Sequence, residues 1–255
     1  EAGAVEKITS RSNGLLGHMK KLAASAAYRR EQGVYLCDSP KLLAEALKWH
    51  APVREIAVTA DVPLPPLPET VRAVEIPEDV MFSISPMKSP QGALFTVTLP
   101  ETAIPEALPG SRYMVLDGVQ DPGNVGTILR TLDAFDFDGL LLLEGCADPW
   151  SVKTVRSSMG AVFRRPVWCL KAAQLPGLLT RSSLPLYGTA LRQDTEDVRA
   201  VPLDRCAIVI GSEGQGISDA VLALCQKTVK IPMSQRCESL NAAIAATVLL
   251  WESYR

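Results

Sequence analysis

Apolar positions in the first hundred residues recur at helical and strand spacings in turn. Apolar side chains three and four residues apart predict a helix over residues 14–30. Ser39-Pro40, a capping residue followed by proline at the first helical position, predicts a second helix that ends near Trp49. The other elements predicted in this part are strands over 34–37, 53–58, 71–76 and 93–99, and a short helix over 77–83. We therefore expect a small α/β domain over residues 1–99.

A proline-rich break follows this domain. Residues 100–111 contain Pro100, Pro105, Pro109 and Gly110 and show no sheet periodicity. Proline-rich segments act as semi-rigid spacers, so we expect an interdomain linker here.

Strand and helix patterns alternate throughout residues 112–255. The strands are predicted over 113–116, 139–143, 167–170, 186–190, 207–210 and 229–231, and the helices over 124–135, 151–159, a segment ending near 180, 217–225 and 239–254. This alternation predicts a second α/β domain with a mostly parallel sheet and helices on both faces. In such sheets, ligands bind beyond the carboxyl ends of the strands.

The charge distribution is uneven along the chain. The net charge of −2 does not require an anionic partner. The segment from Lys7 to Arg30, however, carries basic residues and no Asp or Glu. It is either a solvated helix face or a phosphate-binding patch, and the composition leaves both open. The candidate phosphate-binding residues are Arg11, Lys20, Lys21, Arg29 and Arg30.

Cysteine and histidine spacing gives no sign of a metal site. None of the six cysteines forms a CxxC pair, and His18 and His50 are not placed to complete a ligand set. Most cysteines lie in apolar surroundings and are expected to be core thiols. The chain shows neither a signal-peptide pattern nor an apolar run near the roughly 18 residues of a membrane span. We expect a reduced, cytoplasmic protein without metal or membrane attachment.

The loop after the strand at 113–116 is the first with unusual chemistry. Asn124 follows a Gly/Pro turn, where a helix N-cap is expected. Arg130 stands among the apolar residues Ile128, Leu129 and Leu132, and so apolar a helix offers little exposed surface. Arg130 is therefore a candidate functional residue, with an ordinary surface arginine as the alternative.

The loop after the strand at 207–210 contains three glycines. Gly211, Gly214 and Gly216 let backbone amides approach a ligand closely, although their spacing is not that of a dinucleotide-binding GxGxxG loop. Glu213 would repel a phosphate, so an adenosine or another uncharged or cationic ligand fits better. A tight strand-to-helix turn is the alternative.

The C-terminal stretch ends in a long apolar helix whose start is polar. Ser239 is predicted as the N-cap, and Asn241, a poor helix former, stands just inside the helix. A polar group at the mouth of an apolar helix often faces another group, but this stretch alone favours a simple capped helix start.

Together the three loops resemble the three motifs of the SpoU/TrmH class within the SPOUT superfamily of RNA methyltransferases. Residues 121–131 resemble motif one, 210–217 motif two and 231–241 motif three, in the same order and spacing. The N-terminal part is similar, through residues 8–13 and the basic helix that follows, to the small substrate-binding domain that these enzymes often carry.

The resemblance implies an RNA 2′-O-ribose methyltransferase that uses S-adenosylmethionine. It also implies a C-terminal trefoil knot, which the periodicity alone would not predict, and a homodimer packed through the second domain. Position by position, it implies these catalytic residues: Asn124, Arg130, Glu213, Ser239 and Asn241. The cofactor-binding residues that it implies are Thr189, Gly211, Ile231, Met233 and Leu240.

The substrate and the proton acceptor stay open. The basic N-terminal helix favours ribosomal RNA over tRNA. A base-methylating relative and a non-catalytic RNA-binding ribosome assembly factor are alternatives, whereas an NAD-linked dehydrogenase has the wrong glycine spacing. Because a guanidinium is a poor base, we expect Arg130 to bind a phosphate and stabilise the developing alkoxide. The phosphate or Ser239 would then accept the proton.

Overall fold

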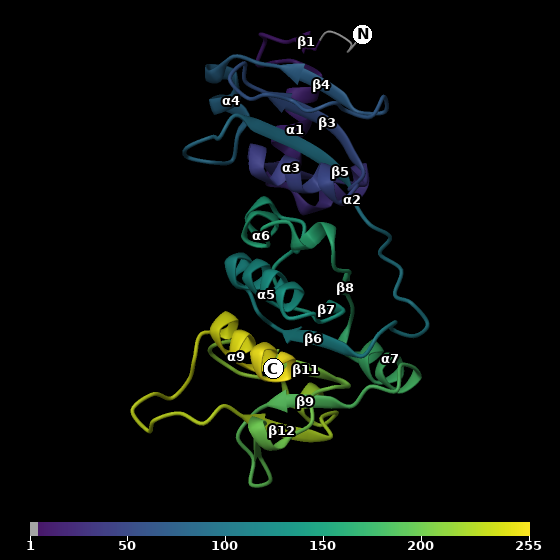
Figure 1. Cartoon of the computed structure of the whole chain (residues 1–255), viewed down its shortest axis with the longest axis vertical. Helices are drawn as coiled ribbons and strands as arrows, with labels where there is room; N and C mark the ends of the chain where they lie inside the picture. Colours follow the sequence, from purple (N-terminus) through teal and green to yellow (C-terminus); the bar gives the residue numbers. More distant parts are fainter. Residues whose placement is uncertain (1–4) are drawn as a thin grey trace. The chain divides into compact units, whose positions relative to one another are not determined.

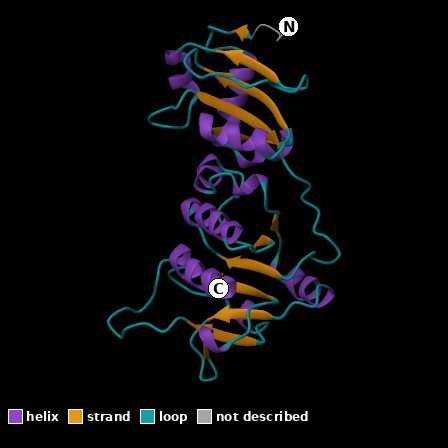
Figure 2. Cartoon of the chain, viewed as in Figure 1, coloured by secondary structure: helices purple, strands orange, loops and turns teal. Residues whose placement is uncertain are grey.

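The computed structural model describes residues 5–255 and divides them into two compact units (Figures 1 and 2). The first unit contains the described residues up to Glu101 together with Trp150–Phe163. The second contains Thr102–Pro149 and Arg164–Arg255. The functional boundaries predicted at residues 99 and 112 stay a prediction.

The first unit is built on a five-stranded mixed sheet with the order β1-β4-β3-β5-β2. Its strands are β1 (Glu6–Lys7), β2 (Val34–Asp38), β3 (Val53–Val58), β4 (Arg72–Glu75) and β5 (Ala93–Thr98). β1, β4 and β3 are parallel, and β5 pairs antiparallel with both β3 and β2. The predicted strands are confirmed, and the α/β class with them.

The helices of this unit differ from the prediction at one point. They are α1 (Gly14–Ala24), α2 (Ala26–Gln32), α3 (Pro40–Lys48), α4 (Glu78–Ile84) and α6 (Val152–Ser157). The single helix predicted over 14–30 is wrong, because the backbone of Ser25 is extended and its hydroxyl caps α2 by accepting a hydrogen bond from the Tyr28 amide at 3.1 Å. Serine competes with the helical backbone in this way and starts helices readily.

The segment Trp150–Phe163 groups with the first unit although it lies far along the sequence. Val152 joins the core cluster that contains Leu36 of β2. The rings of Trp150 and Tyr35 lie 5.1 Å apart between centroids. Arg156 donates from Nε and Nη2 to the buried Asp38 carboxylate at 3.2 and 3.1 Å. An ion pair with a buried member stabilises only while both partners are present, so α6 and β2 depend on one another.

The second unit contains a seven-stranded parallel sheet with the order β10-β12-β9-β11-β6-β7-β8. Its strands are β6 (Arg112–Asp117), β7 (Gly139–Leu142), β8 (Val167–Cys169), β9 (Leu186–Thr189), β10 (Glu196–Asp197), β11 (Cys206–Gly211) and β12 (Lys227–Lys230). The predicted parallel sheet is confirmed. All six residues of β11 are buried, as expected for a strand covered on both faces. β10 was not predicted because two residues carry no periodicity.

Two of the helices of the second unit, α5 and α9, begin at capping residues other than those predicted. They are α5 (Pro122–Ala134), α7 (Leu175–Arg181), α8 (Asp219–Leu222) and α9 (Ala242–Tyr254). Asp121 rather than Asn124 caps α5, and Asn241 rather than Ser239 caps α9. α9 packs beside α5 (Figure 1). The C-terminal trefoil knot stays a prediction.

None of the helices in the described part of the chain has the length and apolarity that crossing a bilayer requires.

Candidate active site

A cavity of about 520 Å³ lies at the carboxyl ends of β9, β11 and β12. Its volume falls within the range of small-molecule sites, and its position is the one where parallel sheets bind ligands. The segment from Ile231 to Leu240 forms a large part of its wall. The residues predicted to bind the cofactor all line it: Thr189, Gly211, Ile231, Met233 and Leu240.

The glycine loop after β11 folds back on itself beside this cavity. The Gly216 amide donates to the Ser212 carbonyl at 2.9 Å, and Gly216 adopts a left-handed φ of 69°. A Cβ on Gly211 would stand 2.0 Å from the Gly216 carbonyl carbon and 2.2 Å from the Ile217 nitrogen. Gly214, by contrast, has open space around it. Glycine is therefore required at Gly211 by close packing and at Gly216 by the left-handed turn. Neither reason applies to Gly214.

A polar cluster ties this loop to the starts of α5 and α9. Glu213 Oε1 accepts hydrogen bonds from Asn124 Nδ2 at 2.9 Å, Asn241 Nδ2 at 3.1 Å and the Ala242 amide at 3.4 Å. Asn241 Nδ2 also lies 3.3 Å from Asn124 Oδ1. A carboxylate at the N-terminus of α9 is favoured by the helix dipole. The sequence predicted all three side chains, and the structure brings them together.

The prediction that Asn124 and Ser239 cap helices is wrong. Asp121 Oδ1 accepts from the Gly123 amide, which leaves the Asn124 amide free to reach Glu213. Asn241 Oδ1 accepts from the Ala243 amide at 2.8 Å and from Ile244 at 3.2 Å, so α9 begins after it. Ser239 instead lines the cavity with its side chain exposed.

Arg130 lies apart from this cluster. It follows Asn124 by six residues on α5, which is about 9 Å along a helix axis. Its side chain is exposed and makes no hydrogen bond to Asn124, Glu213 or Asn241 in the described chain. The prediction that α5 offers little exposed surface is wrong, because Thr127, Arg130 and Ala134 form an exposed strip.

The predicted RNA-binding residues divide into two groups. Arg11, Lys20, Lys21 and Arg30 are exposed. Arg29 is only 5% exposed, and its Nη1 donates to the Leu22 carbonyl at 2.7 Å. Arg29 therefore joins α2 to α1, and this buried guanidinium is removed from the candidate RNA surface.

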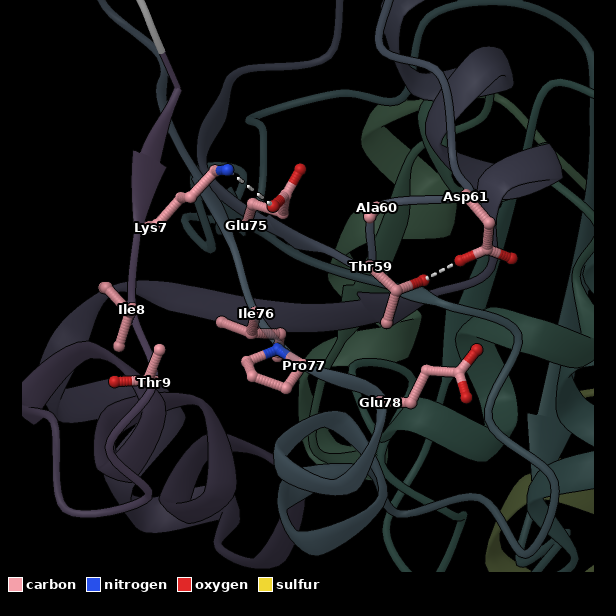
Figure 3. Close-up of a pocket in the computed structure, with 10 residues that line it drawn as sticks. All are labelled: Lys7, Ile8, Thr9, Thr59, Ala60, Asp61, Glu75, Ile76, Pro77 and Glu78. Atoms are coloured by element: carbon pink, nitrogen blue, oxygen red, sulfur yellow. Dashed lines mark hydrogen bonds and ion pairs between the residues drawn. The ribbon is translucent and has the colours of Figure 1, made fainter.

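A second cavity, of about 380 Å³, lies in the first unit near the carboxyl ends of β1, β3 and β4 (Figure 3). Lys7 faces Glu75 with 3.9 Å between Nζ and Oε2, and the Thr59 hydroxyl donates to Asp61 at 2.5 Å. Glu78 adds a third carboxylate. This acidic lining repels phosphate, so the cavity is not a candidate for binding an RNA backbone.

Residues 5–255 contain no cluster of three or more histidine, cysteine or acidic side chains suited to a metal ion. The expectation that most cysteines are core thiols holds for three of the six, the buried Cys37, Cys206 and Cys225. Burial raises the pKa of Cys225 to about 11 and that of Cys206 to about 12. Both thiols are therefore protonated at neutral pH. Cys237, by contrast, is exposed and lines the cavity of the second unit.

Known proteins resemble this chain in sequence along nearly its whole length. The model of the SpoU rRNA Methylase family matches residues 111–251. The 23S rRNA (guanosine(2553)-2′-O)-methyltransferase RlmP of Bacillus subtilis is 30% identical over 97% of this chain and 98% of its own length. An uncharacterized tRNA/rRNA methyltransferase of Synechocystis is 34% identical over 98% of this chain and 94% of its own.

Solved structures resemble it in fold to the same extent. An RNA methyltransferase of the TrmH family from Porphyromonas gingivalis has a TM-score of 0.84 and 34% identity, covering 95% of this chain and 97% of its own. The SpoU methyltransferase AviRb from Streptomyces viridochromogenes, in complex with the cofactor AdoMet, has a TM-score of 0.82 and 26% identity with the same coverage. The family model spans more than half of the chain, and the chain belongs to the SpoU rRNA methylase family.

Proposed function

We propose that this protein transfers a methyl group from S-adenosylmethionine to a ribose 2′-hydroxyl in ribosomal RNA. The observation that carries this proposal is the cavity beside the Glu213 cluster, where residues of three sequence motifs meet. The name of the Bacillus subtilis relative, a 23S rRNA 2′-O-methyltransferase, supports both the ribose and the ribosomal substrate. An rRNA substrate and six free cysteines favour a reduced cytoplasm.

The cavity suits S-adenosylmethionine in size and charge. Ile231, Met233 and Leu240 supply apolar lining, and Gly211 lines the cavity where the glycine loop packs closely against it. Glu213 and Glu238 also line the cavity, and carboxylates favour a sulfonium over a phosphate. When bound, the cofactor supplies an electrophilic methyl group.

The chemistry requires a base and a site for developing negative charge. The ribose oxygen forms a bond to the methyl carbon as the carbon–sulfur bond breaks, and its proton passes to the adjacent phosphate or to Ser239. Arg130 stays protonated, binds that phosphate and stabilises the developing alkoxide. Asn124 and Asn241, held by Glu213, position the ribose.

The exposed cations of the first unit bind phosphates of the RNA in this proposal. Lys20, Lys21 and Arg30 project from α1 and α2, where the one acidic residue is Glu31, next to Arg30. Arg11 lies 3.2 Å from Asp79, but both side chains are well exposed, and such surface pairs contribute little. RNA affinity should therefore fall steeply with salt.

The protein functions as a homodimer through the second unit in the same proposal. Trp251 and Tyr254 of α9 are each about half exposed, and both rings lie 5.7 Å from that of Phe135. Ile244 adds a further exposed apolar side chain on α9. Clustered exposed aromatics are typical of interfaces. Because α5 carries Arg130, this interface would lie near the catalytic arginine.

Replacing Trp251 by glutamate is expected to convert dimers into monomers. The charge would be buried without a partner in the interface, which strongly disfavours association. Light scattering after size-exclusion chromatography should give a mass near 27.5 kDa for the variant and twice that for the wild type. Trp49→Glu, at a similarly exposed tryptophan of the first unit, is the matched control and should stay dimeric. A monomeric wild type would contradict the proposal.

The reaction itself is tested by methyl transfer from labelled S-adenosylmethionine to ribosomal RNA lacking the modification and, separately, to bulk tRNA. The RNA is digested to nucleosides and analysed by mass spectrometry. We expect a 2′-O-methylated nucleoside from ribosomal RNA. A methylated base would overturn the ribose assignment, and label in tRNA alone would overturn the substrate. Absence of both transfer and cofactor binding would overturn the enzyme assignment and favour a non-catalytic RNA-binding protein.

A further inference from the structure

We propose that His18 of α1 and Tyr28 of α2, two partly exposed side chains, form a stacking platform for an unpaired base of the RNA. This inference rests on the RNA substrate proposed above. It adds a recognition element to the phosphate contacts of the basic residues, because it distinguishes unpaired nucleotides from duplex.

The two rings are held in a fixed arrangement. His18 Nδ1 and the Tyr28 hydroxyl lie 2.7 Å apart, and the ring centroids are 5.5 Å apart at an interplanar angle of 69°. The hydrogen bond fixes the imidazole plane before any ligand arrives, so little side-chain freedom remains to be lost on binding. Both side chains are partly exposed. A base can therefore stack on the His18 ring while the hydrogen bond with Tyr28 holds that ring in place from the core side.

A lysine accompanies the rings. Lys21 Nζ lies 5.8 Å from the centroid of the Tyr28 ring, within cation–π range. Proteins that bind single-stranded nucleic acid combine aromatic rings for the bases with cations for the backbone. The three side chains supply that combination on one surface.

Glycines in α1 leave its backbone open beside His18. Gly14 and Gly17 are helical, and neither has a left-handed φ. A Cβ at either position would have nothing within 4 Å. Glycine is unfavourable inside a helix, and here neither packing nor backbone conformation calls for it. Because residues three and four apart share a helix face, the glycines border His18 and Lys21, where glycine permits a ligand to approach the backbone closely.

The charge of this surface selects the occupant. No acidic residue lies between Lys7 and Arg30, and Lys20, Lys21 and Arg30 are exposed there, outnumbering the exposed Glu31 that follows Arg30 on α2. The surface therefore attracts a polyanion. In an RNA duplex the bases are stacked inside and cannot reach a protein ring, whereas unpaired bases can splay out and stack. An unpaired RNA segment offers bases that can stack on the rings and phosphates that can bind the cations.

The first test compares the full chain with variants for binding to fluorescein-labelled RNA of about 15 nucleotides, within the range of single-strand site sizes. A duplex of the same sequence is measured in parallel. His18→Ala should weaken single-strand binding about tenfold, in line with the loss of one base–aromatic stack, and leave duplex binding unchanged. Tyr28→Phe, which keeps the ring but removes the hydrogen bond, should give a smaller loss. Trp49→Ala is the matched control, since Lys48 lies 5.9 Å from the Trp49 ring centroid but outside the basic segment.

The second test separates a ligand role of Gly17 from a structural one. Gly17→Gln should raise the unfolding midpoint by about 2 °C because glutamine favours helix. The same variant should bind single-stranded RNA several-fold more weakly, because its side chain blocks approach to the backbone. Ala44→Gln, at an exposed alanine of α3, should leave binding unchanged. A lowered midpoint in Gly17→Gln would mean that the glycine serves the fold and would overturn its role in RNA binding.

Unchanged single-strand affinity in His18→Ala, or an equal loss for duplex, would overturn the platform and leave a surface that contacts phosphates only. Methyl transfer to ribosomal RNA is measured on the same preparations. Transfer without a His18 effect on single-strand binding would refute the platform alone. A His18 effect without transfer would refute the proposed reaction and leave the platform standing.

Discussion

Arg130→Ala is expected to lose methyl transfer by about 10²–10³-fold, the effect of removing one group that stabilises charge in a transition state. Cofactor affinity should stay within about twofold of the wild type, because Arg130 is not among the residues that line the cavity. Transfer falls while cofactor affinity stays the same because the guanidinium contacts the RNA phosphate and the developing alkoxide, not the cofactor. Single-turnover transfer of labelled methyl and calorimetric titration with S-adenosylmethionine measure the two quantities.

Two further variants sharpen this test. Arg130→Lys keeps the charge but not the two-pronged geometry, so it should recover only part of the rate. Arg181→Ala, at an exposed arginine of α7, is the matched control and should transfer methyl normally. Loss of both transfer and cofactor binding in Arg130→Ala would indicate a structural arginine. Undiminished transfer would remove Arg130 from the mechanism.

Gly211→Ala is expected to abolish cofactor binding and to destabilise the second unit. The added methyl would stand 2.0 Å from the Gly216 carbonyl carbon and 2.2 Å from the Ile217 nitrogen. Both are backbone atoms, so the loop itself must move. Overpacking of this kind costs about 3 kcal/mol, which lowers the unfolding midpoint of a chain of this size by roughly 10 °C. Calorimetric unfolding and cofactor titration are the measurements.

Gly214→Ala is the matched control for this prediction. Gly214 lies in the same loop but does not line the cavity, and a methyl group added there would have nothing within 4 Å. The unfolding midpoint and cofactor affinity of this variant should equal those of the wild type. If Gly211→Ala bound the cofactor normally, the close approach of Gly211 and Gly216 would not shape the cavity.

The strands were predictable wherever burial leaves a continuous apolar run. β2 and β11 are buried at every position, and both were predicted to within one residue of their observed ends. The helix starts were less predictable, because capping residues compete within a few positions. Asp121 and Asn124 can both cap α5, and Ser239 and Asn241 can both cap α9. At both helix starts an asparagine side chain, Asn124 or Asn241, donates a hydrogen bond to Glu213, which is distant in sequence from Asn124 and from Asn241.

The site was predictable in its chemistry and its place, but not in its contacts. The rule that ligands bind beyond the carboxyl ends of parallel strands places the loops together, and Glu213 indicated a ligand that is not a phosphate. Arg29 shows the limit of charge patterns, since a basic run does not reveal which member turns inward to bond Leu22. Arg130 became a candidate because its apolar neighbours suggested that the helix was buried on all sides. Its side chain is in fact exposed.

The grouping of Trp150–Phe163 with the first unit limits how the chain can be divided into fragments that fold. A fragment starting at residue 112 would carry α6 without β2, exposing the apolar side chains of Trp150 and Val152. A fragment ending at residue 101 would leave the carboxylate of Asp38 without its guanidinium. Neither cut gives an intact half. A fragment of either part that is meant to fold should therefore keep the contacts of α6 with β2, or replace the side chains that these contacts bury.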